Sequence, residues 1–320
     1  MLKNTIFTLI LAFSAAFANA QTLNDFNDVR QMGVLLNPAH IGKADAKGEL
    51  GVHLQNNSNN YYSRLFASLS YVHHLKLKNG DGLNIGLIAE NQGFRQYINI
   101  MGGGLNVAYI HNFNEKNALS GGITASIVNG KQEIRVINIE ETDNVAYYSG
   151  KYTFLYPTIN LGFAWKNKIS ENANLSAGFA ANNINRPTVM YNFEDNNGEK
   201  TTINTSTYTN YTATFNADFM VSKVIGFAPM LMYSIKPFSR NIHTTSNTFT
   251  FGSDIRFRFK GKHAICAGYF GKLNPGISSA TYNLGYENSK MNVGLSYGWL
   301  YSQYYYYAYP ILQTNFRYAF

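Results

Sequence analysis

The chain has 320 residues, of which 45% are hydrophobic, 15% aromatic and only 14% charged, with a formal net charge of +8. A disordered or acidic chain is excluded because so much aromatic surface has to be buried. Mean hydropathy is −0.20, and beyond the N-terminus no stretch approaches the roughly 18 uninterrupted apolar residues that a membrane helix needs. The composition leaves two possibilities, a soluble all-β protein or a β-barrel whose apolar residues alternate with polar ones.

The N-terminal residues have the features of a signal peptide. Lys3 precedes the short apolar stretch 6–13, and Ala18 and Ala20 form a small-x-small cleavage site. We expect residues 1–20 to be removed after Ala20 and the mature chain to be exported. Cys266 is the only cysteine, so neither a disulfide framework nor an N-terminal lipid anchor is predicted.

Apolar and polar residues alternate with period two along much of the chain. In the stretch 248–260, Phe249, Phe257 and their apolar neighbours share one parity, whereas Asp254 and Arg256 share the other. Successive side chains of a strand face opposite sides of a sheet. The pattern recurs with Gly, Asn, Ser and Thr on the polar face and with Tyr and Trp near the strand ends. This is typical of a barrel whose apolar half faces the lipids of an outer membrane.

Fourteen segments of this kind can be marked. They cover residues 48–56, 65–77, 83–91, 97–113, 118–131, 156–166, 173–181, 208–221, 226–236, 247–260, 262–271, 278–287, 290–299 and 309–320. Short connections rich in Asn, Gly and Asp follow the even-numbered segments, and the longest connections, which follow odd-numbered ones, are 132–155, 182–207, 237–246 and 300–308. The sequence therefore predicts an all-β fold: a transmembrane up-and-down antiparallel barrel of about 14 strands with short periplasmic turns and long extracellular loops.

Three regions follow from this assignment. Residues 1–20 form the signal peptide, residues 21–47 form an N-terminal periplasmic or lumen-docked segment, and residues 48–320 form the barrel. In the last strand Phe316, Tyr318 and the terminal Phe320 share one face. Such a strand resembles the insertion signal that the barrel-assembly machinery reads. Its alternative interpretation is an ordinary closing strand.

Charged residues on the predicted inward face have two interpretations. A basic cluster in the lumen would select anions, whereas pairing with inward carboxylates would fill the lumen, and we favour the pairing. The basic residues are Arg256, Arg258, Lys260 and Arg317, and the carboxylates are Glu90, Asp218, Asp254 and Glu287. The net charge is too diffuse to predict binding of nucleic acid.

No catalytic constellation is apparent in the sequence. The seven histidines are scattered, and His73 and His74 would point to opposite faces of one strand. There is no Cys pair, no HExxH motif and no Gly-x-Ser-x-Gly elbow. We therefore expect a protein that is not an enzyme and that has no cofactor and no metal site.

A short motif precedes the first predicted strand. Asn37, Pro38, Ala39 and Gly42 match an Asn-Pro-Ala-x-x-Gly pattern, and together with the length, the signal peptide and the aromatic terminus they make the chain resemble the PorP/SprF family of type IX secretion outer-membrane proteins. Members usually have an aromatic and a small residue at positions 40 and 41. The Asn-Pro step disfavours a helix, and Gly42 permits a backbone path closed to other residues. The motif is therefore either a turn that docks the N-terminal segment or a contact with partners.

The resemblance implies an accessory role in type IX secretion and gliding motility. Proteins of this family support the secretion or surface attachment of large adhesins that carry a type B C-terminal domain, and some associate with periplasmic type IX secretion components. The alternative that we keep open is a general or solute-specific porin, because the polar inner face and the barrel size could leave an aqueous lumen.

Overall fold

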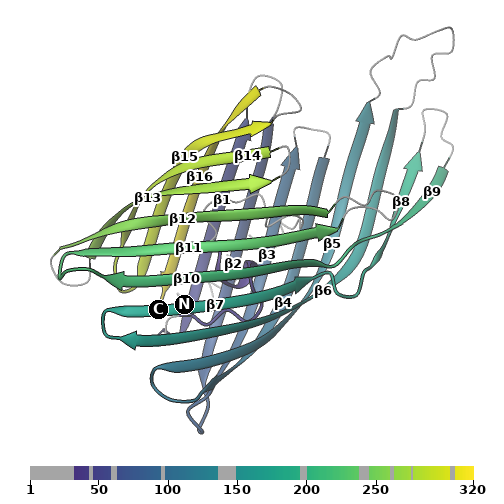
Figure 1. The fold of residues 1–320 in the computed structure, drawn as a ribbon. Coiled ribbons are helices and arrows are strands. Elements are labelled where there is room, and N and C mark those ends of the chain that lie inside the picture. The colour runs from purple at the N-terminus through teal and green to yellow at the C-terminus, as the bar shows by residue number, and fades with distance from the viewer. Residues whose placement is uncertain are drawn as a thin grey trace, which may run out of the picture.

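The computed structural model describes residues 32–42, 46–58, 63–94, 98–135, 149–194, 200–237, 245–259, 263–274, 277–302 and 307–320. The predicted signal peptide, residues 21–31 and Lys260 therefore lie outside the described residues. The described part contains one short 3-10 helix and sixteen strands (Figure 1). Their bounds are η2 Gly33–Leu35, β1 Gly48–Ser58, β2 Ser63–Lys76, β3 Gly82–Phe94, β4 Ile98–Asn112, β5 Asn117–Arg135, β6 Ser149–Ser170, β7 Ala173–Asn182, β8 Thr188–Glu194, β9 Lys200–Ser206, β10 Asn210–Met220, β11 Ile225–Pro237, β12 Thr245–Phe259, β13 His263–Asn274, β14 Ile277–Glu287, β15 Met291–Ser302 and β16 Tyr307–Ala319.

Fourteen of these strands form a closed antiparallel barrel, which confirms the predicted fold class. Neighbours in the chain pair with each other, β7 pairs with β10, and the first and last strands, β1 and β16, close the ring. The barrel has no free sheet edge because each of the fourteen strands is paired on both sides. Within the described residues no helix has the length and apolar character needed to cross a bilayer.

The segment 182–207 is not a loop, and that detail of the prediction is wrong. It contains β8 and β9, which pair with each other, and β8 also pairs with the outer part of β6 at Lys151, Tyr152 and Thr153. Between β7 and β8 the extended conformation is interrupted at Asn183 and Arg186, which have positive φ angles. In Figure 1, β5, β6, β8 and β9 extend beyond the ends of the neighbouring strands. Polar residues that alternate with few apolar ones hide this hairpin from a sequence-based assignment.

The two faces of the strands differ as the alternation predicts. In β12 the outward Phe257 is 45% exposed, whereas the inward Thr250 is fully buried at 0%. Exposed Leu, Ile, Phe and Tyr recur on the outward face of the barrel strands, since this face meets hydrocarbon rather than water. The inward face is dominated by Ser, Thr, Asn and Gly, but not wholly so. An apolar cluster also lies inside the barrel.

Short turns gather at one end of the barrel, which we call the short-turn end. The described ones are residues 77–81, 113–116, 171–172, 221–224 and 288–290. The turn between β2 and β3 is fixed by Asp81, which accepts hydrogen bonds from the Tyr109 hydroxyl, from the backbone N–H of Asn112 at 3.0 Å and from the Asn79 amide at 2.7 Å. The bonds from Tyr109 and Asn112, with His111 beside them, lower the pKa of the Asp81 carboxyl to about 2.

Removing the Asp81 charge is expected to lower the thermal unfolding midpoint of the barrel at pH 7. Because the pKa of Asp81 is depressed in the folded state, its contribution is present above the ordinary carboxyl value near 4 and is lost as pH falls toward about 2. The difference between wild type and Asp81→Asn should therefore shrink over that interval. Glu115→Gln, in the neighbouring turn, is the control and should show no such difference. An Asp81→Asn difference that is equal at pH 7 and pH 2 would contradict this assignment.

Candidate functional site

Residues 32–42 form a segment that we call the plug, and it lies inside the barrel (Figure 1). Gly33 has φ +50°, a left-handed conformation that favours glycine, and starts the 3-10 turn that reverses the chain. Leu36 and Asn37 both donate backbone N–H groups to the Gly33 carbonyl, at 3.1 and 3.2 Å. These bonds hold the plug as a compact turn rather than an extended thread.

The apolar side chains of the plug join opposite walls of the barrel. Met32 and Leu35 are 0% and 4% exposed and pack with Phe66 on β2, with Met230 and Met232 on β11 and with Phe270 on β13. In the order of strands round the barrel, β2 and β11 lie opposite each other, seven strands apart in a ring of fourteen. The plug therefore spans the lumen, and its contact with both walls buries apolar surface that the polar lumen would otherwise expose.

The Asn-Pro-Ala motif rests on a patch of small residues. The Asn37 amide donates to the Phe163 carbonyl at 2.9 Å, and its oxygen accepts the N–H of Ala39 at 2.9 Å. A Cβ at Gly162 would lie 2.1 Å from the Asn37 oxygen, and a Cβ at Gly122 would lie 2.3 Å from the Pro38 carbonyl oxygen. Glycine is needed at these wall positions because the plug backbone approaches so closely.

A side chain at Gly122 should displace the plug. Because the clash in Gly122→Val is with plug backbone, we expect a loss of about 1–3 kcal/mol in unfolding free energy, the usual range for overpacking. Gly103→Val is the matched control, since the nearest atom to a Cβ there is the Ile88 carbonyl oxygen at 3.6 Å, an ordinary contact. Denaturant unfolding of the two purified variants checks the expectation, which fails if both lose the same free energy.

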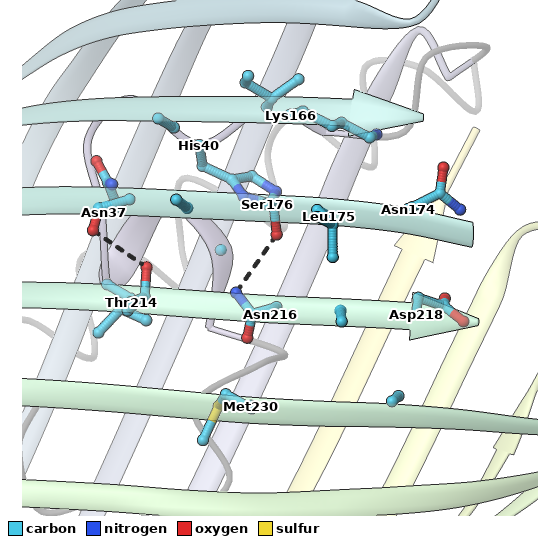
Figure 2. A pocket seen from close by; sticks show the side chains of 18 of the residues that line it. Asn37, His40, Lys166, Asn174, Leu175, Ser176, Thr214, Asn216, Asp218 and Met230 are labelled. Atoms are coloured by element: carbon cyan, nitrogen blue, oxygen red, sulfur yellow. Dashed lines mark hydrogen bonds between the residues drawn. The ribbon is translucent and has the colours of Figure 1, made fainter. Parts of the chain in front are cut away.

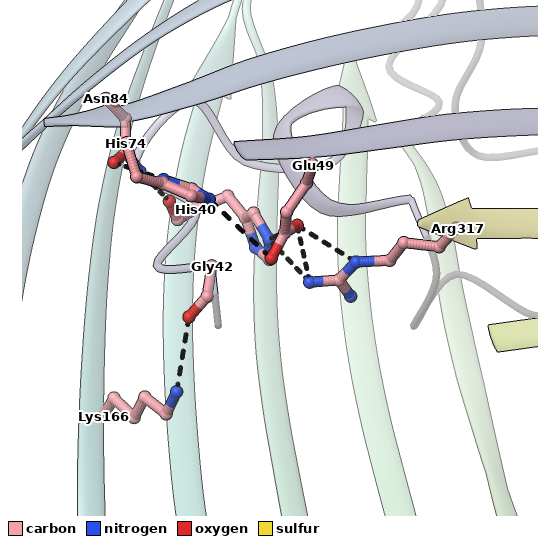
Figure 3. A network of polar contacts seen from close by, with 7 residues as sticks. All are labelled: His40, Gly42, Glu49, His74, Asn84, Lys166 and Arg317. Carbon is pink, nitrogen blue, oxygen red and sulfur yellow. Dashed lines mark hydrogen bonds and ion pairs between the residues drawn. The ribbon is translucent and has the colours of Figure 1, made fainter. Parts of the chain in front are cut away.

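A buried ionic network ties the C-terminal half of the plug to the wall (Figure 3). Arg317 donates two bonds to one carboxylate oxygen of Glu49, at 2.7 and 3.0 Å, and His40 lies 3.3 Å from the same oxygen. The second oxygen of Glu49 is 3.8 Å from His74. Burial lowers the pKa of the His40 imidazole, which is therefore neutral at pH 7. Arg317 thus supplies a full positive charge to the buried Glu49 carboxylate.

The same network reaches the plug backbone. Asn84 donates its amide to the His40 carbonyl at 2.9 Å and accepts a bond from His74 at 2.7 Å. Imidazole and carboxylate groups such as those of His40, His74 and Glu49 can bind metal ions, but Arg317 already forms an ion pair with the Glu49 carboxylate. Among the described residues no group of three or more His, Cys, Asp or Glu side chains is arranged to hold a metal ion.

Three of the predicted lumen charges form one cluster, and the described charges do not make a continuous basic surface. Arg256 on β12 forms an ion pair with Asp218 on β10 and lies 3.5 Å from Glu287 on β14. Asp254 accepts a bond from Asn283 at 3.3 Å. The cluster places one cation between two carboxylates, so its charge is compensated within the lumen.

The remaining predicted charges are dispersed. Glu90 is 7% exposed on β3, while Arg258 is exposed near the short-turn end. The partner of Arg317 is Glu49, which is not among the predicted lumen charges. Glu49 and Arg317 are 268 positions apart and meet only because β1 and β16 close the barrel. The pair could have been predicted from position. Both residues lie near the same end of the barrel, on the first and last strands, which must pair to close it.

A cavity of about 410 Å³ lies in the lumen between the plug and the short-turn end, and we call it the vestibule (Figure 2). The plug lines one side through Asn37 and His40. The walls come from strand ends on β6, β7, β10, β11, β12, β14, β15 and β16, with Lys166, Asn174, Ser176, Thr214, Asn216, Asp218, Met230, Arg256, Glu287, Asn292 and Arg317 among the lining residues. The strand residues among them lie no more than six positions from the strand ends that meet the short turns.

The aromatic terminus lies on the outer face. Phe320 is 44% exposed, stacks on Tyr71 at 6.1 Å and on Tyr318 at 6.3 Å, and exchanges backbone hydrogen bonds with Gly48. Phe316 has the same parity and is half-buried. The role of these residues as an insertion signal stays a prediction.

A closed barrel with an apolar outer belt and a mostly polar inner face defines the chain as an outer-membrane β-barrel. The chain belongs to the family described as type IX secretion system membrane protein PorP/SprF, whose model matches residues 18–305. It is therefore a membrane component of type IX secretion. A search of curated proteins finds no match.

Solved outer-membrane barrels share the fold at low sequence identity. The TodX deltaS2S3 mutant monoaromatic hydrocarbon channel has a TM-score of 0.62 and 9% identity, over 96% of this chain and 98% of that chain. A Pseudomonas aeruginosa FadL homologue has a TM-score of 0.58 and 10% identity, over 95% of this chain and 100% of that one. For the CymD monoaromatic hydrocarbon channel the values are 0.56 and 10%, over 92% and 94%. These likenesses show the fold.

Proposed function

We propose that this protein is a non-enzymatic accessory of type IX secretion and gliding motility, which supports the secretion or surface attachment of large adhesins with a type B C-terminal domain. In this proposal the signal peptide is cleaved after Ala20, the barrel-assembly machinery inserts the barrel, and the short-turn end faces the periplasm. The hairpin of β8 and β9 and the longer connections lie on the extracellular side of the membrane, where they contact the adhesin. Periplasmic type IX secretion components are met at the short-turn end.

The observation that carries the accessory role is the filled lumen. The plug joins opposite walls through Met32 and Leu35, and Glu49 and Arg317 hold its second half. A barrel blocked by its own chain leaves its two ends as the surfaces available to partners. This arrangement supports a docking function better than free diffusion of solutes.

The test is deletion of the gene followed by measurement of adhesins on the cell surface. We expect adhesins with a type B C-terminal domain to be lost from the surface and to return with the wild-type gene. Secreted proteins that lack this domain are the internal control and should be unaffected. If every type B adhesin still reaches the surface normally, the proposal is wrong.

The second candidate is an outer-membrane porin. It is favoured by the likeness in fold to monoaromatic hydrocarbon channels and by the polar vestibule on one side of the plug. Conductance of the purified wild-type barrel in planar bilayers separates the candidates. A stable open channel in the absence of any partner would favour the porin, and a closed barrel would favour the accessory.

A further inference from the structure

Three hydrogen bonds between groups of the vestibule wall are long. Asn216 donates to Ser176 at 3.5 Å (Figure 2). Thr214 donates to the Gly178 carbonyl at 3.5 Å, and Asn292 donates to Glu287 at 3.5 Å. The side-chain oxygen of Asn216 is buried and has no hydrogen-bond partner in the described part of the chain. All three bonds are at the limit of hydrogen-bond length, so the wall retains most of its capacity to bind something else.

Two of the three cations that line the vestibule, Arg256 and Arg317, are paired with carboxylates, and the third, Lys166, donates to the Gly42 carbonyl of the plug. Arg256 lies between Asp218 and Glu287, and Arg317 is held by Glu49. A ligand that brought a net charge would have to compete with these pairs. The vestibule therefore suits a neutral group that carries many hydrogen-bond donors and acceptors.

The lumen wall already binds a polypeptide backbone with this chemistry. Side chains of the wall donate to three main-chain carbonyls of the plug: Asn106 to Pro38 at 2.9 Å, Asn84 to His40 at 2.9 Å and Lys166 to Gly42 at 3.4 Å. The amides of Asn174 and Asn216 present the same chemistry to the vestibule. Main-chain N–H and C=O groups are the neutral donors and acceptors that match them.

We propose that the vestibule binds a second, extended polypeptide segment, supplied by a partner protein that reaches the barrel from the short-turn end. The segment lies beside the plug, and the amides of Asn174 and Asn216 bind its main chain. The vestibule wall on β7 runs from Asn174 to Gly178, which at about 3.4 Å per residue accommodates roughly four extended residues. This inference deepens the proposed function and rests on it for the compartment from which the partner comes.

Photo-crosslinking in intact cells identifies the occupant. The photoreactive amino acid p-benzoylphenylalanine replaces Ser176 in the vestibule, or the outward-facing Asn129 as the control position. Mass spectrometry of the irradiated barrel should find a peptide of another protein attached at position 176 and absent at position 129. Attachment to residues of this chain, attachment to a glycan, or no adduct at position 176 would each overturn the proposal.

The crosslinked sequence is then synthesised and titrated against the purified full-length barrel. Loss of two hydrogen bonds in the double variant Asn174→Leu, Asn216→Leu should weaken binding about ten-fold, whereas Asn129→Leu should leave it unchanged. Equal binding by the double variant and wild type would overturn the site. Surface display of adhesins is measured in the same strains. If display requires the gene but no peptide is crosslinked at position 176, the vestibule site is refuted and the accessory role stands.

Discussion

Replacing the plug with a flexible linker is expected to turn a closed barrel into a conducting one. In this variant residues 32–42 become a Gly-Ser sequence of equal length. Phe66 and Met232 then lose the side chains that join them across the lumen. A barrel of this size, between the small filled barrels and the larger porins, encloses an aqueous path once its interior is emptied. Planar-bilayer recordings of the purified variant should show discrete channel events that wild type lacks.

The control for this experiment is a Gly-Ser replacement of residues 221–224. These residues form an exposed turn between β10 and β11, so the change disturbs a connection of the barrel without touching the plug. We expect the control to stay as closed as wild type. A folded plug variant that remains closed would show that the plug does not seal the lumen.

Removing the Arg317 guanidinium is expected to cost about 3–5 kcal/mol of unfolding free energy. The large value arises because Arg317→Ala leaves the Glu49 carboxylate, which is only 5% exposed, without its main cationic partner. Denaturant unfolding in detergent, followed by tryptophan fluorescence, measures the loss. The exposed Arg258, on β12 at the same end of the barrel, provides the control, since Arg258→Ala should change stability by no more than about 0.5 kcal/mol.

A second variant separates the charge effect from lost packing. Glu49→Gln combined with Arg317→Gln removes both charges, and we expect it to be less destabilising than Arg317→Ala because no unpaired buried charge remains. If the double variant is the less stable of the two, or if Arg317→Ala loses under about 1 kcal/mol, the pair contributes by packing and not by charge.

The strands could be predicted because their signal is local. Period-two alternation in a stretch such as Phe249 to Phe259 reports which side chains face lipid, and no distant residue has to be known to read it. The same locality explains the error at residues 182–207. The β9 segment, Lys200–Ser206, is almost wholly polar and so carries little alternation. The pairing of β8 with β9 and with β6 is decided by how distant parts of the chain align.

The motif Asn37-Pro38-Ala39 was visible in the sequence, but its environment was not. The sequence allowed two interpretations of the motif, a docked turn and a contact with partners. Both rest only on the local backbone, which the Asn-Pro step disfavours as a helix. That Asn37 rests against Gly162 and that a Cβ at Gly122 would strike Pro38 depends on two strands, β5 and β6, which pair side by side.

The sequence by itself determined the outer-membrane barrel, the sorting of its faces and the membership in the type IX secretion family, because each rests on periodicity or on a contiguous motif. Only the tertiary structure decided what fills the lumen. Met32 joins β2 to β11, and Glu49 meets Arg317 across the closure of β1 on β16. Contacts across a lumen are set by the closure and stagger of the whole ring, and no stretch of neighbouring residues carries that information.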